Sequence, residues 1–232
     1  MDQRTGLTRS PKLARGAIVQ IVDSVIGIDP SIVPMQYNPE TLSMTITPFD
    51  PNEVEQSGRG QIAPTSQPYA PKRQITLEIH LDAAALLEDE DPVATAVGVA
   101  DRLAALERLL MPSEGLIGDL IGAIGTLTGN PQPPKRASVP IALLILGPGR
   151  ILPVRITSYS VEETHFLPSL HPLMAKVSLG FEVLTPDVFR CDTGPSVEFA
   201  IAAYNFYEVQ QSALAVAHAA RNAAKASSLL PF

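Results

Sequence analysis

The sequence is poor in cysteine, aromatic residues and charge. Its 232 residues include one cysteine and no tryptophan, with 5% aromatic and 18% charged residues. The single cysteine, Cys191, excludes a disulfide within the chain. The 17 basic residues are scattered among 24 acidic ones and the net charge is −7, which argues against a nucleic-acid-binding protein, because such proteins carry a basic patch.

Long apolar runs are missing as well. No stretch of about 18 apolar residues is present, so we expect no membrane-spanning helix. Residues 1–16 are polar and lack the apolar core of a signal peptide, so we expect a flexible N-terminus and assembly in the cytoplasm.

The motifs of common enzymes are also absent. The sequence contains no nucleophile elbow, phosphate-binding loop, dinucleotide fingerprint or zinc-protease motif. No two histidines have metal-ligand spacing; they are His80, His165, His171 and His218. Four strand-borne acids are loose candidates for the paired carboxylates of a carbohydrate-active enzyme: Glu78, Glu162, Glu163 and Glu182. We therefore expect no enzyme, no metal and no cofactor.

What the sequence does contain is alternation of apolar and polar residues, which indicates half-buried strands. Residues 74–82 (QITLEIHLD) show it most clearly, with Ile75, Leu77, Ile79 and Leu81 on one face. Similar or β-branched patterns predict strands over residues 17–28, 42–47, 139–146, 151–163 and 173–184. A long loop rich in proline, glycine and polar residues is expected over residues 50–72.

Two helices are predicted among these strands. Asp91 and Pro92 suit the cap and first position of a helix that continues to Met111. Residues 197–226, rich in alanine, favour a long C-terminal helix. The predicted fold is mainly β: a tail-tube-like β-barrel or sandwich over residues 17–186 with one packed helix, an insertion at 113–138 and a helical extension over 187–232.

Four stretches together resemble the tube-like proteins of contractile injection systems, the particles related to phage tails. They are MQYNPETLSMTIT (35–47), QITLEIHLDAA (74–84), VPIALLILGPGRILPVRITSYSVEETHF (139–166) and HPLMAKVSLGFEVL (171–184). Their order around one helix is similar to that family, and it covers most of residues 17–186. Residues 187–232 do not resemble the LysM module that baseplate members often carry.

The resemblance implies a baseplate subunit that forms a six-membered, tube-like ring. Such a homo-hexamer would connect the spike hub to the inner tube, with wedge proteins outside. Two alternatives remain within the same particle: the main inner tube protein, and a membrane-associated anchor that uses residues 113–129.

Candidate contacts with partners fall in three places. The first is the turn at Asn38 and Pro39. The second is the glycine-striped insertion, with Gly118, Leu120, Ile121, Gly122 and Ile124, which is either covered by a partner or a flexible loop. The third is the C-terminal helix, where Phe206, Val209 and Leu214 pack either on a wedge or hub protein or on the chain's own strands.

Overall fold

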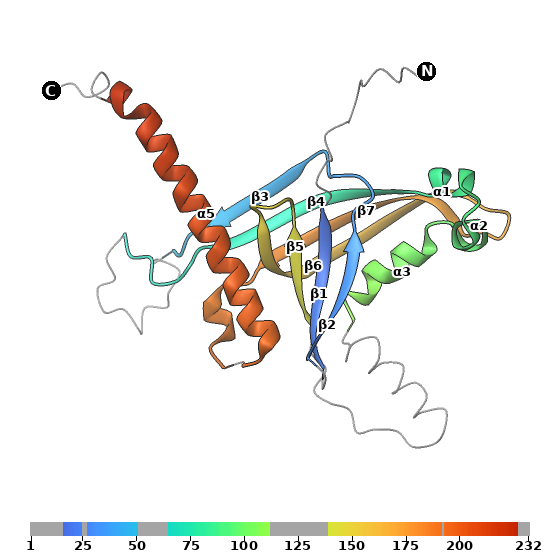
Figure 1. Ribbon diagram of the computed structural model, residues 1–232, viewed down its shortest axis with the longest axis horizontal. Helices are drawn as coiled ribbons and strands as arrows, with labels where there is room; N and C mark the ends of the chain where they lie inside the picture. The colour runs from blue at the N-terminus through green and yellow to red at the C-terminus, as the bar shows by residue number, and fades with distance from the viewer. Residues whose placement is uncertain (1–15, 25–26, 51–64, 112–138, 192, 227–232) are drawn as a thin grey trace, which may run out of the picture.

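The strands form a single antiparallel sheet with a long helix beside it (Figure 1). The computed structural model describes residues 16–24, 27–50, 65–111, 139–191 and 193–226. The seven strands are β1 (Ala17–Ser24), β2 (Gly27–Pro34), β3 (Leu42–Thr47), β4 (Lys72–Asp82), β5 (Ile141–Ile145), β6 (Ile151–Phe166) and β7 (Pro172–Val183). Their order across the sheet is β2-β1-β5-β6-β7-β4-β3, and every neighbouring pair is antiparallel.

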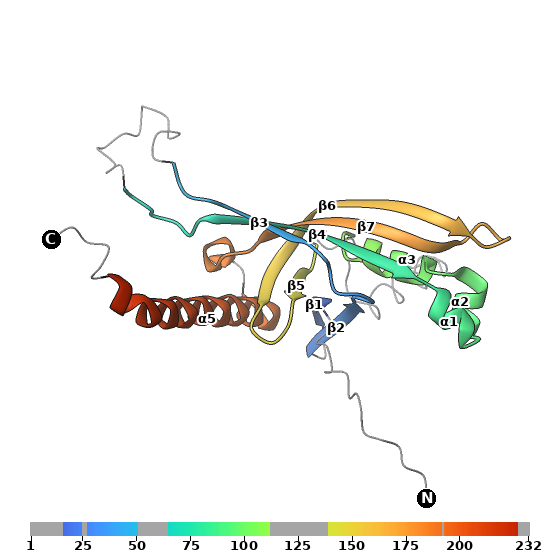
Figure 2. The ribbon, with the colours of Figure 1, turned by 90° about the horizontal axis from the view of Figure 1, so that it is seen from above.

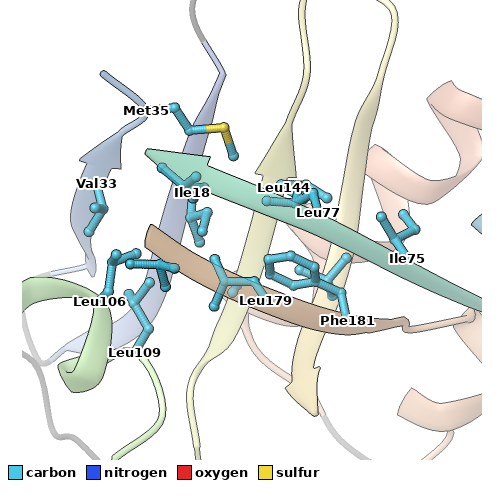
Figure 3. Packing of buried hydrophobic residues seen from close by; sticks show 14 of the residues in the cluster. Ile18, Val33, Met35, Ile75, Leu77, Leu106, Leu109, Leu144, Leu179 and Phe181 are labelled. Carbon is cyan, nitrogen blue, oxygen red and sulfur yellow. The ribbon is translucent and has the colours of Figure 1, made fainter. Parts of the chain in front are cut away.

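The sheet bends over itself, so that its two ends share one core. In Figure 1, β1, β2 and β5 run steeply across the direction of β4, β6 and β7. Figure 3 shows Ile18 of β1 and Leu144 of β5 gathered with Leu77 of β4 and Phe181 of β7, and all four are buried in one cluster. The prediction of a mainly β fold with a packed helix is confirmed, and within one chain the sheet stays open, with β2 and β3 at its two ends.

The strand predicted over residues 17–28 was wrong in one respect. It is a hairpin: β1 ends at Ser24, and β2 begins at Gly27 and pairs back along β1. Pro30 and Pro34 both lie within β2. Proline is tolerated there because β2 is the last strand of the sheet and needs no donors on its outer side.

The helix predicted over residues 92–111 is divided in two. Asp91 caps α2 (Pro92–Val97) as expected, since its Oδ1 accepts hydrogen bonds from the backbone N–H of Val93 and Ala94 at 3.0 and 2.8 Å. The chain then turns at Gly98, with φ of 60°, before α3 (Ala100–Arg108) begins. A side chain at Gly98 would place its Cβ 2.1 Å from the carbonyl oxygen of Pro172, so only glycine fits against β7.

Three helical elements complete the fold. The short α1 (Ala84–Glu88) follows β4, and a 3₁₀ turn, η2 (Pro186–Phe189), follows β7; neither was predicted. The predicted C-terminal helix is confirmed as α5 (Pro195–Ala226). Helix α3 packs beside β2 and closes the core with Leu103, Leu106 and the following Leu109, all of which are buried.

Candidate assembly surfaces

The strands β6, β7, β4 and β3 form a layer with two opposite faces. The inner face is apolar: cross-strand register places Met44, Ile75, Phe181 and Ile156 level with one another, and this row packs on the core. The outer face, which we call the polar face, carries small and polar residues from all four strands. It comprises Ser43, Thr45, Thr47, Gln74, Thr76, Glu78, His80, Arg155, Ser158, Ser160, Glu162, Thr164, Lys176, Ser178, Gly180 and Glu182. The layer is therefore a two-sided sheet with a wet outer surface.

Charges on the polar face neutralise one another across strands. Glu78 Oε2 lies 3.0 Å from Lys176 Nζ, and Glu78 Oε1 lies 3.0 Å from His80 Nε2. The hydrogen bond from Lys176 lowers the pKa of Glu78 below its ordinary value, and the hydrogen bond to Glu78 raises the pKa of Lys176. Register also places Glu162 opposite Lys176. These cross-strand charge pairs bridge β4, β7 and β6 without giving the face a strong net charge.

Both borders of this layer have strand edges without a partner among the described residues. β3 pairs with β4 on one side only. β6 is longer than its neighbour β5, which pairs only with Ile151 to Val154, so that residues 158–166 of β6 pair with β7 alone. The ladder shifts register between Ile156 and Ser158, where β6 leaves β5. Rows of unpaired backbone N–H and C=O groups are templates for another strand.

The inner face of the layer ends at an ion pair that holds α5. Arg73 follows the core face of β4, and its Nη1 donates to Oε1 of Glu208 on α5. The guanidinium carbon lies 5.9 and 5.5 Å from the ring centroids of Tyr204 and Tyr207. Burial alone would lower the pKa of Arg73, but the hydrogen bond and the charge of Glu208 outweigh it, and the pKa is raised. This cluster anchors the first half of α5.

The second half of α5 projects beyond the sheet (Figures 1 and 2). Residues 211–221 are all exposed, although seven of these eleven are alanine, leucine or valine. The predicted contacts Phe206, Val209 and Leu214 are 43, 68 and 62% exposed, and Val216 is 69% exposed. The first half of α5 packs on the rest of the chain through its buried apolar residues, Val197, Ala200, Ala203, Tyr204 and Tyr207. Phe206, Val209 and Leu214 lie outside that contact, and whether they meet a wedge or hub protein stays a prediction.

The turn at Asn38 and Pro39 has a structural role within the chain. Asn38 Oδ1 accepts a hydrogen bond from the backbone N–H of Gly16 at 3.0 Å, which ties the turn to the start of β1. The neighbouring Gln36 bonds both backbone groups of Asp82, at 2.8 and 2.9 Å, and accepts from Arg102 at 2.5 Å. We had not singled out Gln36 or Arg102, and nothing in their sequence context distinguishes them from surface residues. Whether this turn also contacts a partner stays a prediction.

The remaining candidate residues give no catalytic or metal arrangement in the part of the chain described. The glycine-striped insertion, with Gly118, Leu120, Ile121, Gly122 and Ile124, lies outside the described residues. Among those described, no three His, Cys, Asp or Glu side chains lie close enough to hold a metal ion. Of the four strand-borne acids, Glu78, Glu162 and Glu182 share the polar face. None of the described helices is long and apolar enough to cross a membrane.

The chain matches no model of a known protein family, and no curated protein is similar enough in sequence to be counted a relative. The layer β6-β7-β4-β3 and the projecting half of α5 are therefore the candidate surfaces on which a functional interpretation depends.

Proposed function

We propose that this protein is a structural subunit of the baseplate of a phage-tail-like contractile injection system. Six copies form a tube-like ring that connects the spike hub to the inner tube, as the resemblance of the four strand motifs implies. The observation that carries the proposal is the layer β6-β7-β4-β3, because it has one polar face, one core face and an unpaired edge at each border.

The strand directions of the layer allow copies to join edge to edge. Four antiparallel strands are an even number, so β3 of one copy runs antiparallel to β6 of the next. Every joint between copies would then have the same pattern as the joints within a copy. A repeated head-to-tail contact of this kind closes into a ring when the rotation between copies is right.

The two free edges also have the stagger that a closed barrel requires. Measured along β4, β3 lies level with residues 72–77, and the free part of β6 lies level with the stretch that begins at Thr76 and continues past Asp82. The midpoint of β3 and the midpoint of the free part of β6 differ by about five residues, or roughly 18 Å, along the strand direction. Across a layer about 19 Å wide, this stagger corresponds to a strand tilt of about 40–45°. Strands in closed barrels tilt by a similar angle, typically about 35–45°.

The two faces then have natural places in such a ring. The apolar face is already covered by β1, β5 and α3 of the same chain, so it lies on the outside with that second layer. The polar face, rich in serine and threonine, lines the lumen, where water and passing cargo meet it. Low overall charge is consistent with a subunit whose borders become interfaces.

Isolation of intact particles tests the function. The chain should co-purify with the sheath, tube and spike proteins, at about six copies per particle. A far larger copy number would favour the main inner tube protein, and its absence from particles would contradict the proposal.

Two adjacent proline variants test the edge-to-edge joint. Neighbouring residues of an antiparallel strand turn their N–H groups to opposite sides. Of Ser160→Pro and Val161→Pro, one removes a donor to β7 and destabilises the fold. The other leaves the β6–β7 ladder intact and removes an outward donor. We expect this second variant to fold but to lose the hexamer in native mass measurements; a full hexamer in both variants would exclude the β6 edge from the joint.

A further inference from the structure

The projecting half of α5 carries an apolar seam that faces solvent. Val209, Ala213, Val216 and Ala220 are spaced 4, 3 and 4 residues apart, and all four are exposed. At about 100° per residue these positions fall within a stripe about 60° wide, on a different side of the helix from the buried Tyr204 and Tyr207. We call these four residues the seam.

The spacing of the seam specifies a helix as its partner. Apolar residues that alternate steps of three and four repeat every 3.5 residues, which is the period at which two helices pack side by side. A strand or a flat surface does not require this period. In the part of the chain described, the one helix long enough to lie along the whole seam is α5 itself.

The sizes of the seam residues specify the direction of the partner. If two α5 helices lay parallel, valine would meet valine and alanine would meet alanine, leaving wide and narrow layers in alternation. If they lie antiparallel, Val209 of one copy is level with Ala220 of the other, and Ala213 with Val216. Each of the four layers then holds one valine and one alanine, so the helices keep an even separation.

Charge and shape permit the same pairing. Between residues 209 and 220 the chain has no lysine, arginine, aspartate or glutamate, and the flanking positions are Gln210, Ser212, Ala217 and Ala219. Identical helices therefore meet without like-charge repulsion. Because this half of α5 projects away from the sheet, antiparallel overlap places the two sheets at opposite ends of the helix pair (Figure 2).

We propose that two copies of this chain pair through an antiparallel contact between the seams of their α5 helices. The contact uses no strand edge, so it is separate from the ring and does not depend on it. The pair forms between free subunits, because the seam residues that are exposed in a monomer become covered in the pair.

Charge substitutions on and off the seam test the contact. Val216→Asp places a carboxylate on the seam, and Leu214→Asp places the same group on another side of the same helix turn; the two parent side chains are 69 and 62% exposed. Both variants should fold, because neither residue is in the core. In sedimentation measurements we expect Val216→Asp to weaken self-association at least 10-fold and Leu214→Asp to change it less than 3-fold. Equal effects of the two substitutions would overturn the proposal. It would also be overturned if Val216→Asp removed no self-association that the parent shows.

Cysteine cross-linking tests whether the two α5 helices run antiparallel, and it does so whether or not a ring forms. In a Cys191→Ser background, Val209→Cys and Ala220→Cys lie 11 residues, about 16 Å, apart along one helix. An equal mixture of the two variants should form a disulfide-linked dimer under mild oxidation, and each variant alone should not. Cross-linking of Val209→Cys to itself would show a parallel pair and refute the antiparallel contact, as would a mixture that stays unlinked.

Discussion

The ion pair between Arg73 and Glu208 should hold α5 on the sheet, and a double-mutant cycle measures how strongly. Two unit charges about 4 Å apart attract by about 4 kcal/mol at an effective dielectric constant near 20. The Glu208 side chain is 39% exposed, so water screens part of this attraction, and the desolvation of Arg73, which is 14% exposed, offsets more. We expect a net coupling of about 1–2 kcal/mol.

Glu208→Gln keeps the size of the side chain and removes its charge. In the parent it should lower the free energy of unfolding by about 1–2 kcal/mol, since it leaves the largely buried guanidinium of Arg73 with a neutral acceptor. In an Arg73→Met background the same change should cost less than about 0.5 kcal/mol. Urea unfolding gives all four free energies, and amide hydrogen exchange over α5 shows whether the loss is local to the helix.

Glu198→Gln provides the control, because Glu198 is an exposed acid in the first turn of the same helix. It should change stability by only about 0.3–1 kcal/mol, through the helix dipole, in either Arg73 background alike. If Glu208→Gln costs the same with and without Arg73, the ion pair contributes nothing to the anchoring of α5. The two tyrosines beside Arg73 would then have to account for it.

Two further predictions follow from the backbone and from a buried hydroxyl. Gly98→Ala should destabilise the fold by more than about 2 kcal/mol, because a Cβ at φ of 60° would meet the carbonyl oxygen of Pro172 at 2.1 Å. Gly147→Ala is the control: its φ is 84° but the space around it is open, so it should cost about 1 kcal/mol. Thermal unfolding compares the two variants, and equal losses of stability would show that the contact with β7 is unimportant. Burial, with the nearby charges of Glu107 and Glu163, raises the pKa of Tyr159 to about 12, so its contribution to stability is full below pH 10 and is lost as pH rises from about 10 to 12. Tyr159→Phe removes this dependence and costs little at neutral pH, since the buried hydroxyl has no hydrogen-bond partner; a variant with the same alkaline unfolding curve as the parent would contradict the assignment.

The alternation of residues predicted the strands well because one face of each strand is buried. In β4, Ile75, Leu77, Ile79 and Leu81 are all buried, as their period of two requires. Local patterns do not say where one strand ends and its return begins. Residues 17–28 are therefore predicted as one strand, although they include all of β1 and the start of β2. The division between α2 and α3 was missed because the contact of Gly98 with Pro172 joins residues far apart in sequence.

The candidate surfaces were predictable to different degrees. The exposed residues of α5 were identified from sequence, but their lack of partners within the described chain was not, since it depends on where the sheet ends. The free edge of β6 had a signal in the sequence: the strand predicted over residues 151–163 is longer than the one predicted over 139–146, so part of it must extend beyond its hairpin partner. The links made by Gln36 and Arg73 join residues far apart in the sequence, and no periodicity predicts such contacts.

The prolines of β2 limit where another chain could pair with the sheet. A chain arriving at that flank would find two donors missing from the row it needs, at positions 30 and 34, so hydrogen-bonded extension is blocked there. β3 and the outer part of β6 contain no proline, so a new chain can add there. In the proposed ring, the sheet would continue from copy to copy through β3 and β6, while the prolines of β2 would resist the open-ended stacking that leads to fibres.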